Sequence, residues 1–131
     1  LHADLRILFR PQPYVGTDPG ACRALQRHVT ARLKDQLAML DRLAATHPVW
    51  LDPDTPSVLC YYWACLMRWM ALYPRDNDRR WYDPARTPAL LRMISALEER
   101  TAVQAARTAE GLGPHPFSAP VLATPPEGSP T

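Results

Sequence analysis

The fold class is decided by residues 57–73, SVLCYYWACLMRWMALY, in which Arg68 is the only charged residue. A helix that is apolar around its whole circumference is normally buried on all sides. A membrane span needs about 20 apolar residues, and this run is shorter and is interrupted by its arginine. We therefore expect residues 57–73 to form the buried central helix of a soluble bundle, beginning at Ser57 and ending before Pro74.

The residues before this stretch predict two further helices. The apolar face of the first one carries Leu1, Leu5, Leu8 and Phe9. Pro11 and Pro13 end that helix, because proline removes a backbone hydrogen bond and clashes with the preceding turn. The second helix is expected from about residue 19 to residue 45, since Asp18 suits the N-cap and Pro19 the first helical position. Its apolar residues recur every three or four positions, as in a half-buried bundle helix: Leu25, Val29, Leu33, Leu37, Leu40 and Ala44.

Two shorter helices are predicted after residue 74. Thr87 followed by Pro88 marks the start of one of them. Its core stripe consists of Leu90, Leu91, Ile94 and Leu97. We expect Thr101 to cap the last helix and Gly111 to end it.

The distribution of proline divides the chain into two parts. Six prolines follow the last helix: Pro114, Pro116, Pro120, Pro125, Pro126 and Pro130. This spacing forbids regular structure. The sequence therefore predicts one all-α domain over residues 1–112, a bundle of about five helices, followed by an extended proline-rich tail over residues 113–131.

Composition argues against several classes of function. The formal net charge of +2 and the lack of a basic run do not indicate a nucleic-acid or membrane partner. The histidines are scattered, without a second ligand at metal-binding spacing: His2, His28, His47 and His115. The three cysteines, Cys22, Cys60 and Cys65, form no disulfide framework and indicate free thiols in a reducing cytosol. We find no catalytic constellation and expect this chain to bind no metal and no cofactor.

Several short motifs stand out in the chain: Pro56-Ser57-Val58 before the aromatic-rich helix, Arg68-Trp69 within it, Pro88-Ala89-Leu90-Leu91, and Glu99-Arg100-Thr101-Ala102-Val103. In their order and spacing they resemble the C-terminal domain of glutathione transferases. The closing segments 110–114 and 126–129 are similar to the tail of certain bacterial members. The resemblance covers nearly the whole chain.

The resemblance implies a function that this chain shares with a second domain. In the family, a thioredoxin-like domain precedes the helices, binds the co-substrate glutathione and supplies the catalytic residue. The helical half contributes one wall of the site for a hydrophobic electrophile and much of the homodimer surface. That wall is expected from the first helix, at Leu1, Leu5, Leu8 and Phe9, which are equally suited to be core residues. We expect this chain alone to be inactive. The alternative is a noncatalytic helical interaction or scaffold module.

One position departs from the family pattern in a way that affects stability. The family usually has Asp three residues after the capping serine, and this chain has Cys60 there. A carboxylate at that position accepts a backbone amide and faces the positive end of the helix dipole. We therefore expect Cys60→Asp to stabilise the domain, unless the thiol is packed in the core, in which case the same substitution destabilises it. A further alternative is a functional thiol, since helix N-termini lower the pKa of cysteine.

Overall fold

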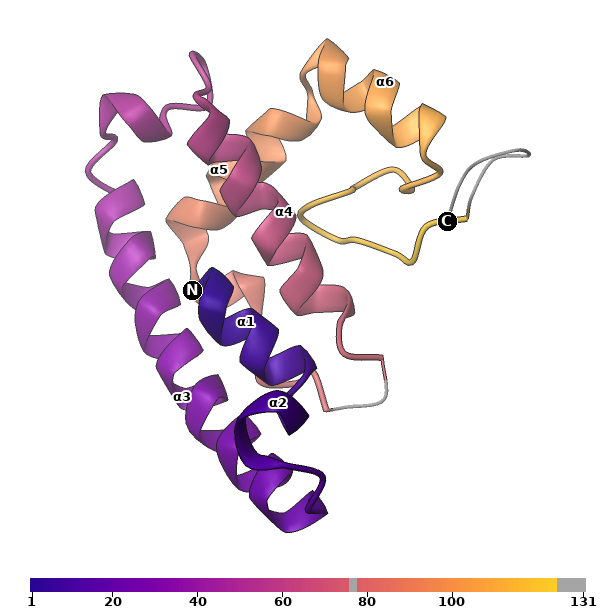
Figure 1. Ribbon diagram of the computed structural model, residues 1–131. Helices are drawn as coiled ribbons and strands as arrows, with labels where there is room; N and C mark the ends of the chain where they lie inside the picture. The colour runs from indigo at the N-terminus through magenta and orange to yellow at the C-terminus, as the bar shows by residue number, and fades with distance from the viewer. Residues whose placement is uncertain (76–77, 125–131) are drawn as a thin grey trace.

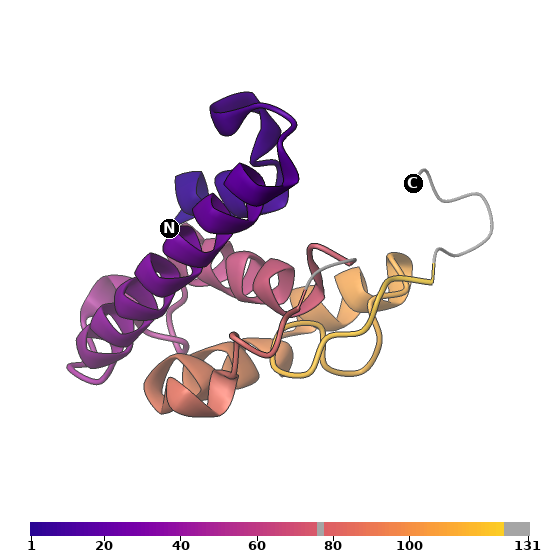
Figure 2. The ribbon, with the colours of Figure 1, turned by 90° about the horizontal axis from the view of Figure 1, so that it is seen from below.

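The chain is all-helical over residues 1–75 and 78–124, which are the residues that the computed structural model describes. In chain order the elements are α1 (His2–Phe9), α2 (Gln12–Val15), α3 (Pro19–Ala44), the 3₁₀ turn η1 (Val49–Leu51), α4 (Val58–Leu72), the 3₁₀ turn η2 (Pro84–Arg86), α5 (Pro88–Glu98) and α6 (Thr101–Ala109). The long helix α3 forms one edge of the molecule (Figure 1). Seen from below, α4 lies between α1 on one side and α5 on the other (Figure 2). The prediction of an all-α fold is confirmed.

Helix α3 follows the sequence prediction closely. The Asp18 side chain accepts the Ala21 amide at 2.6 Å and so caps its first turn. The predicted apolar stripe is buried except at its first residue, Leu25, which is partly buried against the core. That stripe packs against both α1 and α5. The sequence does not predict the short helix α2, because Pro13 is expected to end a helix; it lies instead in the first turn of α2, where proline is tolerated.

The prediction that α4 is buried on all sides is wrong in one respect. Ser57 caps the helix as expected, accepting the Leu59 amide at 3.1 Å. One face is buried in the core and consists of Cys60, Ala64, Leu66, Met67, Met70 and Leu72. The opposite face is open, and Val58 on it is 80% exposed. The helices of residues 1–75 and 78–124 therefore leave one face of α4 uncovered.

Two helix caps also differ from the prediction. The first amides of α5, those of Ala89 and Leu90, donate to Asp41 Oδ1 of α3 at 2.8 and 2.9 Å. The Thr87 hydroxyl instead donates to the Pro84 carbonyl oxygen. Thr101 is the first residue within α6 and not its cap. A side chain from another helix thus caps the start of α5.

The segment after α6 is irregular, as predicted, but it is packed onto the helices. Glu98 of α5 is 3% exposed and accepts the amides of Phe117 and Ser118 at 2.7 Å each. Arg68 of α4 donates to the carbonyl oxygens of Pro116 and Val121, both at 2.9 Å. We call residues 113–124 the docked tail. The remainder of the predicted tail, residues 125–131, lies outside the described residues.

Candidate functional site

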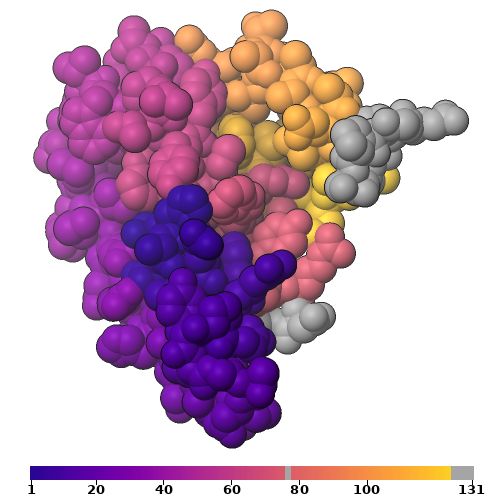
Figure 3. Space-filling model, viewed as in Figure 1, coloured from indigo at the N-terminus to yellow at the C-terminus, as the bar shows by residue number. Residues whose placement is uncertain are grey.

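The open side of α4 forms an apolar surface together with the start of α1. The exposed residues of α4 recur at steps of three and four positions, so they lie on one side of the helix. They are Val58, Leu59, Tyr62, Cys65 and Trp69. Figure 3 shows that α1 lies on the same side of the molecule as α4. The exposed residue His2 of α1 belongs to this surface as well. We call these six residues the α1–α4 face.

His2 joins the two helices of the α1–α4 face. Its Nδ1 lies 2.6 Å from the Tyr62 hydroxyl oxygen, a hydrogen bond whose donor depends on the histidine tautomer. The imidazole also meets the rings of Tyr62 and Trp69 edge-on, with centroid distances of 5.9 and 6.1 Å. These contacts hold three aromatic groups in a fixed arrangement at the surface, as is typical of residues that anchor an interface.

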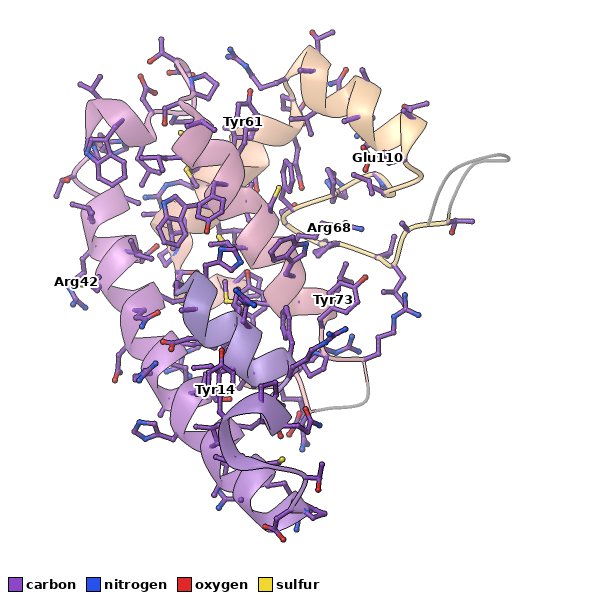
Figure 4. The ribbon with its side chains drawn as sticks, viewed as in Figure 1. Tyr14, Arg42, Tyr61, Arg68, Tyr73 and Glu110 are labelled. Atoms are coloured by element: carbon purple, nitrogen blue, oxygen red, sulfur yellow. The ribbon has the colours of Figure 1, made fainter. Side chains whose placement is uncertain are left out.

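A hollow lies beside α1 and α2. It has a volume of about 390 Å³ and is lined by Arg6, Phe9, Arg10, Pro13 and Tyr14. The Phe9 ring packs edge-on against Tyr73 at a centroid distance of 6.2 Å, which links the hollow to the end of α4. Figure 4 shows Tyr14 beside α1 and α2, and Tyr73 at the C-terminal end of α4. The hollow falls within the size range of small-molecule sites.

Cys65 is the nucleophile-bearing residue of the α1–α4 face. Although Cys65 is exposed as a residue, partial desolvation of its thiol raises the pKa of that group, and the positive charge of Arg68 only partly opposes the effect. A raised pKa keeps the thiol protonated at neutral pH, and the thiolate is the reactive form. Cys65 therefore lacks the features of an activated nucleophile, and the α1–α4 face is better suited to binding than to chemistry.

The four residues predicted for the electrophile site separate into two pairs. Leu5 and Leu8 are each 1% exposed and belong to the core, which was the alternative role for this set. Leu1 and Phe9 are partly buried and remain accessible. Of this pair, Phe9 lines the hollow. A wall contributed by α1 would therefore be formed by Leu1 and Phe9.

The sequence predicts none of the six residues of the α1–α4 face as a site residue. A run that is apolar on all sides does not show which side neighbouring helices leave open. The spacing of Val58, Tyr62, Cys65 and Trp69 is typical of residues on one face of a helix. The buried residues of α4 have the same spacing, so the pattern does not distinguish the exposed face from the buried one.

Comparison with known proteins adds no assignment, because no protein family, curated protein or solved structure matches this chain. Within the described residues, no three His, Cys, Asp or Glu side chains come together as metal ligands would. None of the helices in residues 1–75 and 78–124 combines the length and the hydropathy of a membrane span.

Proposed function

We propose that this chain is the helical, C-terminal domain of a glutathione-transferase-like protein. In this proposal a thioredoxin-like domain covers the α1–α4 face and binds glutathione. The observation that carries the proposal is the apolar face of α4, where Val58 is 80% exposed and Tyr62 and Trp69 are about two-fifths exposed. Contiguous exposed apolar residues in a soluble protein mark an interaction surface.

The hollow beside α1 supports the second part of the proposal, that this domain contributes to the electrophile site. Phe9 and Tyr14 offer aromatic surface to an apolar substrate, and Tyr14 is 56% exposed. Arg6 and Arg10 line the same hollow and suit a substrate that develops negative charge as its leaving group departs. The full protein then conjugates glutathione to a hydrophobic electrophile and forms a homodimer.

The test compares this chain with the full-length product of its gene in a glutathione-conjugation assay with 1-chloro-2,4-dinitrobenzene. We expect activity only for the full-length protein. In that protein, Phe9→Ala should raise KM for the electrophile about tenfold, as loss of one apolar contact of roughly 1.4 kcal/mol does. Val49→Ala, at an 85% exposed position outside the hollow, is the matched control.

Two results would contradict this proposal. One is a full-length protein that binds no glutathione and conjugates nothing. The other is a conjugation rate for this chain alone that exceeds the buffer rate. In the first case, loss of partner binding in Tyr62→Ala and Trp69→Ala would favour a noncatalytic interaction module, which uses the same face.

A further inference from the structure

A second concave surface lies along α3, away from the residues of the α1–α4 face. It has a volume of about 390 Å³ and is lined by Arg23, Gln26, Arg27, Thr30, Ala31, Lys34, Asp78 and Trp81. A smaller hollow of about 140 Å³ continues it and shares Lys34 and Trp81 with it. We call the two together the α3–Trp81 groove.

The α3–Trp81 groove is positively charged. Arg23, Arg27 and Lys34 are exposed and lie at steps of four and seven along α3, so they face the same side. Their charges make no ion pair with any carboxylate of the described residues. The acidic group of the larger hollow is Asp78, whose carboxylate accepts two hydrogen bonds from the Arg80 guanidinium, both at 2.9 Å. Three cations are thus left to attract an anion.

Trp81 supplies a flat apolar wall at the junction of the two hollows. Its ring is partly buried and packs edge-on against Tyr82 at a centroid distance of 5.8 Å, which fixes its orientation. On the other side of Lys34, the smaller hollow adds Leu37 and Ala38 of α3. Asp83, Arg86 and Thr87 complete the lining of the smaller hollow. The groove therefore presents three cations at one end, and at the other a mixed surface in which Trp81, Leu37 and Ala38 are the apolar part.

We propose that the α3–Trp81 groove binds a nucleoside phosphate, with the phosphates on Arg23, Arg27 and Lys34 and the base against Trp81. Arginine guanidinium groups pair with phosphate oxygens through two parallel hydrogen bonds. Nucleobases stack on aromatic side chains without regard to their sequence identity. Thr30 lines the same hollow and has a hydroxyl group that is a further donor. The proposal is independent of the glutathione-transferase assignment, because it uses none of the same residues.

Isothermal titration calorimetry of the whole chain with ADP, inorganic phosphate and adenosine tests the proposal. ADP is expected to bind more than tenfold more tightly than either phosphate or adenosine, since only ADP uses both ends of the groove. Arg27→Gln should weaken ADP binding about tenfold, the effect of losing one strong charged contact. Trp81→Leu should weaken ADP and leave phosphate unchanged.

Matched controls distinguish the loss of contacts in the groove from a change in net charge and from a loss of folding. Arg42→Gln removes the same charge from an exposed position of α3 outside both hollows (Figure 4). Trp50→Leu removes a tryptophan that is 41% exposed elsewhere. Both should bind ADP as the parent does, and circular dichroism should show native helix content in every variant. The proposal is overturned if ADP does not bind at millimolar concentration, if phosphate binds as tightly as ADP, or if Arg42→Gln weakens ADP as much as Arg27→Gln.

Discussion

Replacing Glu98 by alanine tests whether the docked tail is part of the folded domain. The carboxylate lies at the end of α5 and accepts three hydrogen bonds of 2.7–2.8 Å, from the amides of Phe117 and Ser118 and from the Ser118 hydroxyl. His115 Nδ1 lies 3.3 Å from the same carboxylate, and its side chain is 60% exposed. The docked tail thus supplies the buried carboxylate with the hydrogen-bond donors that water supplies to an exposed one.

The magnitude follows from these contacts. A hydrogen bond to a charged group contributes roughly 1.5–3 kcal/mol, and each buried amide left without a partner costs about 1–3 kcal/mol. Desolvation of the carboxylate offsets part of that gain, and the exposed His115 adds little. We expect Glu98→Ala to lower the free energy of unfolding by about 3–4 kcal/mol. Glu98→Gln keeps the shape and loses the charge, so we expect about half that loss.

Urea unfolding of Glu98→Ala, Glu98→Gln and the parent measures the change. Limited proteolysis should cut the docked tail sooner in the alanine variant, because Phe117, which is 8% exposed in the native fold, becomes accessible. Glu99→Ala is the control, since Glu99 is the exposed neighbour and should change stability by no more than about 0.5 kcal/mol. If Glu98→Ala costs no more than this control, the tail does not depend on the carboxylate and the reasoning fails.

The remaining predictions concern individual contacts of Gly111, Asp41 and Cys60. Gly111→Ala should destabilise the domain, because Gly111 has φ of +61° and an added Cβ would lie 1.8 Å from the Thr124 carbonyl oxygen; an unchanged melting temperature would contradict this. Asp41→Ala should cost about 1–2 kcal/mol in urea unfolding by removing the cap of α5, whereas Asp35→Ala, exposed on the same helix, should be neutral. Cys60→Asp should destabilise the domain, because Cys60 is fully buried with its sulfur 3.7–3.8 Å from two backbone carbonyl oxygens, which a carboxylate would repel. A higher unfolding midpoint for that variant would instead support the capping role expected from the family pattern.

The environment of Cys60 shows what a local capping motif predicts correctly and what it leaves out. Ser57 caps α4 and Cys60 occupies its third position, both as the sequence predicts. What the motif does not contain is the path of residues 50–52, whose backbone closes over the sulfur. The second of the two outcomes considered from the sequence is therefore the one that the structure supports.

Local information in the sequence determined the helices themselves. The apolar periodicity of α3, the Asp18 and Ser57 caps and the Gly111 terminus depend on interactions within about four residues, which a single segment contains in full. The same is true of the irregular tail, because its closely spaced prolines remove backbone donors and clash with the preceding turn, so that no helix can continue through them.

Only the tertiary structure decided which surfaces are covered and which are open. The hydrogen bond between Glu98 and Ser118 joins residues 20 positions apart, and the one between Asp41 and Leu90 joins residues 49 positions apart. No local pattern in the sequence specifies either contact. The open side of α4 and the groove at Trp81 depend on how many helices pack around each apolar surface. Burial of apolar area is non-directional, so sequence identifies the side chains that can be buried, and the packing of distant segments selects those that are.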